Sequence, residues 1–67
     1  MPVINVQMLR GRTAQQKKDF VAEVASVATR TLQVPSHAIV ILITELEPED
    51  WSVGERSMAE IRSDQSR

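Results

Sequence analysis

The chain opens with MPVINVQMLRGR, residues 1–12, and this stretch decides how the rest of the sequence is arranged. Apolar side chains recur at every second position between residues 2 and 9, a period that predicts a β-strand with one buried face. The buried face is expected to carry Pro2, Ile4, Val6 and Met8. The strand is expected to end before Gly11, which frees the backbone to turn away.

A helix is predicted to start just after this strand and to end near Gln33. Thr13 and Gln16 have the spacing of a capping box, in which each side chain accepts a hydrogen bond from the other residue's backbone N–H. Apolar residues then recur every three or four positions and form one stripe: Phe20, Val21, Val24, Val27, Ala28, Thr31 and Leu32. Pro35 biases Val34 away from helical angles and so ends the helix. The stripe is expected to pack against a sheet.

Residues 39–43, IVILI, are apolar at every position and rich in β-branched side chains, which is typical of a strand buried on both faces. One helix can cover only one of these faces, so we expect a second subunit to cover the other. Strand, helix and strand in this order predict a right-handed βαβ unit with parallel strands.

The C-terminal part of the chain is predicted to be less regular. Pro48 and Gly54 bracket a segment that is expected to form a short β-hairpin, with Trp51 as its only large apolar side chain. The acidic stretch within residues 45–50 is expected to be a solvated turn. Beyond it, an apolar pair one helical turn apart indicates a loose terminal helix, whose last residues, 63–67, are expected to fray.

Length and charge restrict the class of protein. A chain of 67 residues forms one domain and buries only ~60% of the surface that its unfolded form exposes. There is no cysteine and His37 is the only histidine, so self-association is the expected support for so small a core. The net charge of −1 argues against nucleic acid and anionic membranes as partners. Because no apolar run approaches the ~20 residues of a membrane helix, we expect a cytoplasmic protein.

Pro2 is the candidate catalytic residue. Initiator methionine is generally removed before a small residue, and loss of Met1 would leave the Pro2 nitrogen as a free secondary amine. An α-amino group titrates near pH ~8 when unperturbed, and an apolar pocket or a nearby cation lowers that pKa. A neutral amine can take a proton from carbon. The start of the chain therefore predicts a general base.

Four features taken together resemble the 4-oxalocrotonate tautomerase family. They are the Met-Pro start on a strand, Gly11-Arg12-Thr13 before a capped helix, Pro35 ahead of a β-branched strand, and an aromatic residue followed by glycine near position 50. The resemblance runs from residue 2 to about residue 54 without a gap. Beyond about residue 57 it gives no guidance.

The resemblance implies a fold and an assembly. It indicates a single tautomerase-like domain over residues 1–67, of the α/β class. A short βαβ unit with parallel strands is followed by a C-terminal β-hairpin, and the subunits assemble as dimers into a hexamer. Active sites in such hexamers are shared between subunits.

The resemblance also implies roles for three residues. Pro2 matches the family's amino-terminal proline, a general base that interconverts the enol and keto forms of a small unsaturated 2-oxo acid. Arg12 matches an arginine that binds a substrate carboxylate and, as a cation, helps to keep the proline neutral. Trp51 stands where the family has an aromatic wall, whose apolar bulk lowers the pKa of the amine. Neither a cofactor nor a metal is expected.

One position departs from the family's pattern. Members that act on dicarboxylates carry a second arginine near the start of the second strand, and this chain has Val40 there. The loss of a bidentate cationic donor removes stabilisation of the transition state for a diacid such as 2-hydroxymuconate. The first hypothesis is therefore a tautomerase for an enol monoacid of the phenylenolpyruvate type, with Arg12 holding the single carboxylate.

Three alternatives stay open. In the first, the chain is one subunit of a hetero-oligomer whose partner supplies the missing arginine. In the second, the enzyme hydrates or dehalogenates an unsaturated acid, with protonated Pro2 as the acid and with Asp50 or Glu55 activating water. In the third, an oligomer keeps the fold without catalysis.

Overall fold

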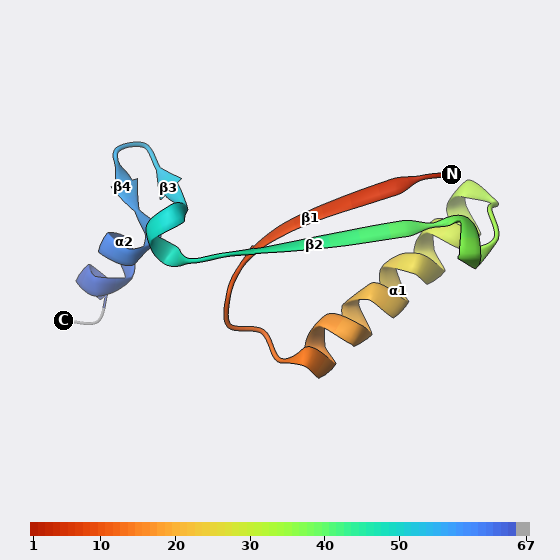
Figure 1. Cartoon of the computed structure of the whole chain (residues 1–67), viewed down its shortest axis with the longest axis horizontal. Coiled ribbons are helices and arrows are strands. Elements are labelled where there is room, and N and C mark those ends of the chain that lie inside the picture. The colour runs from red at the N-terminus through yellow and green to blue at the C-terminus, as the bar shows by residue number, and fades with distance from the viewer. Residues whose placement is uncertain (66–67) are drawn as a thin grey trace.

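The computed structural model describes residues 1–65, which form a two-stranded parallel sheet, a long helix, and a small hairpin followed by its own helix (Figure 1). The elements in chain order are β1 (Val3–Leu9), α1 (Ala14–Leu32), β2 (Val40–Leu46), β3 (Ser52–Val53), β4 (Arg56–Ser57) and α2 (Met58–Gln65). Single 3-10 turns lie at Ser36–Ala38 and Pro48–Asp50. The predicted α/β class, the parallel βαβ unit and the C-terminal hairpin are confirmed.

β1 and β2 are paired along their whole length, starting with Val3 opposite Val40. Backbone hydrogen bonds extend this pairing at both ends. The Val40 N–H donates to the carbonyl oxygen of Pro2 at 3.0 Å, and the Arg10 N–H donates to the carbonyl oxygen of Leu46 at 2.9 Å. Pro2 is therefore fixed beside the first residue of β2, at the end of the sheet that lies farthest from the hairpin (Figure 1).

The ends of α1 match the sequence prediction. The Thr13 hydroxyl accepts a hydrogen bond from the Gln16 N–H at 3.0 Å, and the Gln16 side chain accepts one from the Thr13 N–H at 2.9 Å. At the other end Gln33 adopts a left-handed conformation with φ 56°, which stops the helix before Pro35. Both ends of α1 are therefore set by residues next to it in the sequence.

The hairpin lies later in the chain than predicted, with Gly54 in its turn and its second strand at Arg56–Ser57. Pro48–Asp50 forms a 3-10 turn, and the strands begin only at Ser52, which lies opposite Ser57. Gly54 makes the tight connection with a φ of 62°, a left-handed conformation that glycine adopts without strain.

The terminal helix α2 is better defined than the sequence indicated. The Ser57 hydroxyl accepts from the Glu60 N–H at 3.2 Å, and the Glu60 carboxylate accepts from the Ser57 N–H at 3.3 Å, so a second capping box starts this helix. The helix continues to Gln65. The fraying expected for 63–67 is therefore not seen over residues 63–65, and the last two residues lie outside the described residues.

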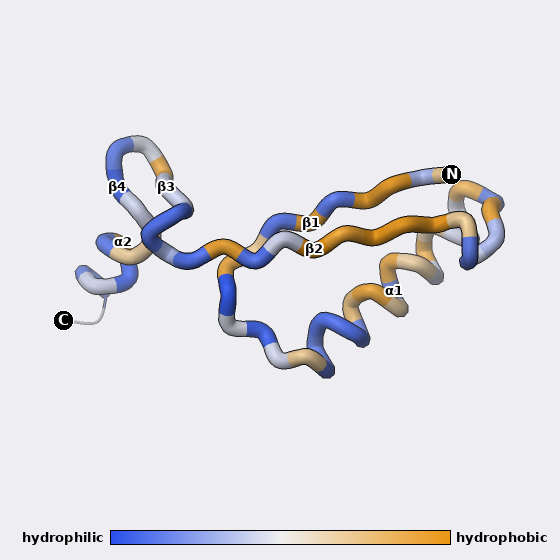
Figure 2. The backbone as a smooth tube through the Cα atoms, viewed as in Figure 1, coloured by the Kyte–Doolittle hydropathy of each residue, from blue (hydrophilic) through white to orange (hydrophobic). Residues whose placement is uncertain are grey.

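One chain covers only one face of its sheet. Along most of β1 half-buried side chains alternate with exposed ones, as the period of two predicted. On the open face Val3 is 55% and Leu42 50% exposed, and Figure 2 shows that β2 is apolar along most of its length. Within residues 1–65, Ala28 is the only hydrophobic side chain that is buried, at 6% exposed. The second face of β2, expected to be buried, is open in the isolated chain.

The capping box of α1 gives a first test of this fold. Replacing Thr13 with alanine removes the acceptor for the Gln16 N–H and should lower the free energy of unfolding by about 1 kcal/mol. Urea denaturation at a fixed protein concentration measures the change. Thr13→Ser keeps the hydroxyl and should recover most of the loss. An equal loss in both variants would assign the effect to the methyl group and contradict the capping role.

Candidate active site

A pocket of about 520 Å³ lies where the end of β1 meets the first turns of α1 and the start of the hairpin. Its polar lining consists of two amides and four cations, and no acidic residue is among the described residues that line it. The cations are Arg10, Arg12, Lys17 and Arg62. The apolar lining is Met8, Leu9, Phe20 and Trp51. The pocket is therefore suited to an anion with an apolar body.

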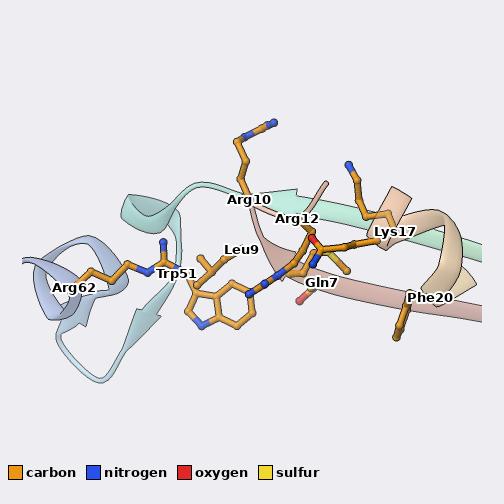
Figure 3. A pocket seen from close by; sticks show the side chains of 10 residues that line it. Gln7, Leu9, Arg10, Arg12, Lys17, Phe20, Trp51 and Arg62 are labelled. Carbon is orange, nitrogen blue, oxygen red and sulfur yellow. The ribbon is translucent and has the colours of Figure 1, made fainter. Parts of the chain in front are cut away.

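Gly11 separates the two arginines of the β1–α1 connection. Its φ of 139° lies in the region that favours glycine, and the chain turns there between Arg10 and Arg12. Arg10 forms an ion pair with Glu47, which raises the pKa of the guanidinium. In Figure 3 the Arg10 side chain points away from Trp51, whereas the Arg12 side chain extends toward it.

Arg12 differs from its neighbours in having no protein counter-ion. Within residues 1–65 it makes neither a hydrogen bond nor an ion pair. A guanidinium is the group that binds a carboxylate through two parallel hydrogen bonds. Arg12 therefore offers an open anion-binding group beside an aromatic ring.

The acidic stretch of residues 45–50 begins in β2 and forms contacts that the sequence did not indicate. Glu45 accepts a hydrogen bond from Lys17 at 2.7 Å and so ties β2 to the first turns of α1. This hydrogen bond, aided by the positive charges of Lys17 and Arg10, lowers the pKa of the Glu45 carboxyl against the opposing effect of desolvation. The expected turn is present at Pro48–Asp50, and Glu49 and Asp50 are exposed there. Glu45 and Glu47 differ from the expectation, because their carboxylates neutralise the pocket cations Lys17 and Arg10.

Trp51 is positioned by its backbone. Its N–H donates to the carbonyl oxygen of Pro48 at 3.4 Å, which closes the 3-10 turn. Its own carbonyl oxygen accepts from the Met58 N–H at 2.6 Å, at the start of α2. The indole is thus carried by the junction of turn, hairpin and helix, and it lines the same pocket as Arg12.

Arg62 was not singled out from the sequence. It lies on α2, lines the same pocket, and points toward Trp51 in Figure 3. The spacing of Ser57 and Glu60, a capping-box signature directly before Met58, was the signal that predicts where this helix begins.

Pro2 lies at the opposite end of the sheet from Arg12 and Trp51 (Figure 1). A strand rises about 3.3 Å per residue, so the seven residues of β1 separate the two ends by roughly 20 Å. Within one chain the structure brings Arg12 and Trp51 together and leaves Pro2 apart. Val40, where dicarboxylate-specific relatives are expected to carry arginine, is the immediate neighbour of Pro2.

The two carboxylates considered for water activation are not in this pocket. Asp50 ends the 3-10 turn and Glu55 lies in the hairpin turn, and neither lines the pocket. In the described part of the chain, no group of three His, Cys, Asp or Glu side chains is placed to hold a metal ion. Neither helix within residues 1–65 is long and apolar enough to span a membrane.

Comparisons with known proteins agree with this geometry. The family described as tautomerase enzyme matches residues 2–61. A probable tautomerase of Listeria monocytogenes is 39% identical over 54 residues, which are 81% of this chain and 88% of that protein. A structure of the 4-oxalocrotonate tautomerase isozymes of Methylibium petroleiphilum has a TM-score of 0.91 at 36% identity, covering 94% of this chain and 98% of that one.

A further structure is a heterohexamer 4-oxalocrotonate tautomerase of Chloroflexus aurantiacus, with 34% identity, a TM-score of 0.86, and coverage of 92% of this chain and all of that one. These matches define the class of protein as an isomerase. More narrowly, the chain belongs to the tautomerase family and is of the 4-oxalocrotonate tautomerase type. The family resemblance stated from the sequence is confirmed.

The contact of Lys17 with Glu45 predicts a pH-dependent stability. The pKa of Glu45 is lowered in the folded protein, so its stabilisation is complete above its ordinary value of 4.5 and is lost as the pH falls through the lowered pKa. Glu45→Gln should therefore destabilise the protein at neutral pH. The difference from the parent should shrink steadily below pH 4.5 in urea denaturation.

Glu49→Gln provides the matched control, because it removes the same charge at a residue that makes no ion pair within residues 1–65. It should leave the denaturation midpoint nearly unchanged at every pH. A loss in Glu45→Gln that is the same at all pH values would contradict the ion-pair interpretation.

Proposed function

We propose that the protein is a keto–enol tautomerase that acts on a small unsaturated 2-oxo acid, with Pro2 as its general base after removal of Met1. The observation that carries this proposal is the Arg12 guanidinium, which has no counter-ion within residues 1–65 and extends toward Trp51 in a pocket lined by no described acidic residue. Such a pocket suits a planar carboxylate with a conjugated, apolar body.

The reaction needs only a proton transfer. The neutral Pro2 nitrogen takes the proton of the substrate's enol hydroxyl, and the electron pair of that bond becomes the carbonyl double bond. The double bond of the enol shifts, and a carbon of the substrate takes the proton back from the proline ammonium. The amine returns to its neutral state, so no further reactant is consumed.

Pro2 must be neutral for this cycle. An α-amino group ordinarily titrates near pH ~8. A guanidinium close to the amine disfavours its protonated form, and an aromatic ring that displaces water does the same. Arg12 and Trp51 have the chemistry for both effects, provided that Pro2 is brought to their pocket.

We infer that assembly brings them together. Pro2 and the pocket of the same chain lie at opposite ends of the sheet, and the face carrying Val3 and Leu42 is open. Dimers that cover this face and associate into a hexamer would place Pro2 of one subunit against Arg12 and Trp51 of another. The need of a 67-residue chain for a larger core supports the same assembly.

Val40 supports a second candidate, a hetero-oligomeric tautomerase. It puts an apolar side chain beside Pro2, where dicarboxylate-specific members are expected to carry a cation. A partner chain with arginine at the equivalent position would supply that cation. This candidate predicts poor turnover by the protein alone, whereas the homo-hexamer predicts that the protein is active without a partner.

The role of Pro2 as general base is tested by measuring turnover. The protein used must have an intact mass that shows the loss of Met1. Ketonisation of phenylenolpyruvate and of 2-hydroxymuconate, followed by ultraviolet absorbance, should be detectable with the protein alone. Pro2→Ala leaves a more mobile and less well placed primary amine and should lower kcat/KM by about 10²-fold or more. Unchanged turnover in this variant would overturn the role of Pro2. No turnover of either substrate by the parent would overturn the homo-oligomeric enzyme.

A mixing experiment tests the shared site. Pro2→Ala and Arg12→Gln should each be nearly inactive. When the two variants are unfolded together and refolded as mixed oligomers, about a quarter of the sites receive Pro2 from one chain and Arg12 from another, by random combination in a symmetric assembly. Activity should return to that extent. Each variant refolded by itself is the control, and a mixture that stays inactive would contradict a site shared between subunits.

A further inference from the structure

Arg10 and Glu47 are placed side by side by the pairing of the strands. The Arg10 N–H donates to the carbonyl oxygen of Leu46, the residue directly before Glu47. The Glu47 carbonyl oxygen accepts from the Asp50 N–H at 2.9 Å, in the 3-10 turn that leads to Trp51. The backbone of Glu47 is therefore held on both sides, and its carboxylate accepts a hydrogen bond from the Nε of Arg10.

This ion pair compensates one of the cations of the pocket. Arg10 and Arg12 both line the pocket. In Figure 3 the Arg10 side chain points away from Trp51, whereas the Arg12 side chain extends toward it. The hydrogen bond and the charge of Glu47, together with the charge of Glu45, raise the pKa of the Arg10 guanidinium. Arg10 is thus turned away from the indole, and two carboxylates act on its charge.

The number of open cations decides how many carboxylates the pocket can hold. A substrate with one carboxylate needs one guanidinium, which Arg12 supplies, whereas a diacid needs a second open cation. Arg62 has an interaction of its own within the chain. Arg10 lies two residues from Arg12 and has the right chemistry for a second carboxylate, but Glu47 already occupies it. The negative charge of Glu47 also repels a second anionic group at this edge of the pocket.

We propose that Glu47 is a positioning residue that sets the specificity of the site: by engaging the Arg10 guanidinium it keeps a second cation from the substrate and favours unsaturated acids with a single carboxylate. This proposal rests on the tautomerase function proposed above and names its substrate class. It agrees with Val40, which leaves the Pro2 end of the same chain without the arginine expected of dicarboxylate-specific members.

Binding is measured without catalysis by the fluorescence of Trp51, the only tryptophan of the chain. The probes are muconate, a conjugated dicarboxylate, and sorbate, a conjugated monocarboxylate of the same chain length. Glu47→Gln keeps the size of the side chain, removes its charge and releases Arg10. The ratio of the sorbate to the muconate dissociation constant should rise about fivefold over that of the parent, as expected for one charge-assisted contact at a solvated site.

Three control variants show whether Arg10 is the cause. Glu47→Gln combined with Arg10→Gln restores the net charge of the parent and should return the ratio to the parent's value. Glu47→Gln combined with Arg30→Gln restores the same net charge by removing a cation from the exposed side of α1, outside this pocket, and should keep the raised ratio. Glu49→Gln removes an equal charge from the same acidic stretch and should leave the ratio of the parent unchanged.

The ratio also distinguishes a specificity role from a structural one. If Glu47 only fastened the chain after β2 to the end of β1, its loss would change both dissociation constants together and leave their ratio as in the parent. An unchanged ratio in Glu47→Gln would therefore overturn the proposal. A raised ratio that persists when Arg10 is also replaced, or that appears equally in Glu49→Gln, would overturn it as well.

The same variants separate the role of Glu47 from the proposed function. A ratio that depends on Glu47 and Arg10, in a protein that turns over neither enol acid, would overturn the tautomerase function and support the role of Glu47 in binding. Turnover that is lost in Pro2→Ala, with the same ratio of KM values for 2-hydroxymuconate and phenylenolpyruvate in the parent and in Glu47→Gln, would overturn the role of Glu47 alone.

Discussion

The parallel pairing of β1 with β2 is the constraint on which the rest of the structure depends. It starts with the hydrogen bond from the Val40 N–H to Pro2 and ends with the one from the Arg10 N–H to Leu46. Because the strands run in the same direction, both chain segments that leave the sheet at its far end, the one after Arg10 and the one after Leu46, leave side by side. This is why the start of α1 and the hairpin share a pocket, and why Pro2 is excluded from it in its own chain.

The same strand register also determines which charged side chains form ion pairs. Two carboxylates at the end of β2 and just after it pair with cations beyond the end of β1: Glu45 reaches Lys17 and Glu47 reaches Arg10. The exposed pair of Arg10 with Glu47 contributes little to stability, whereas the partly buried pair of Lys17 with Glu45 contributes more. Their effect on the pocket is larger, because they compensate part of its positive charge and leave the guanidinium of Arg12 without a protein partner within residues 1–65.

Features set by neighbouring residues were predictable from the sequence. The period of two in β1, the capping box of Thr13 and the stop at Gln33 each depend on a few consecutive residues, and all three were predicted. The ion pairs of the pocket join residues 28 and 37 positions apart, and they follow from a strand register that no local pattern specifies. Arg62 lies past the end of the family resemblance, and only the three-dimensional fold shows that α2 turns back toward Trp51.

Ala28 is the only buried hydrophobic side chain of the described residues, so the stability of this fold depends strongly on what covers its open face. By mass action, any partner that covers the open face of β2 stabilises the fold by an amount that rises with the logarithm of that partner's free concentration. If the partner is another copy, the rate of synthesis becomes a determinant of stability. Newly made chains then spend their most vulnerable interval alone, when the exposed strands of the sheet are open to proteases and to mispairing.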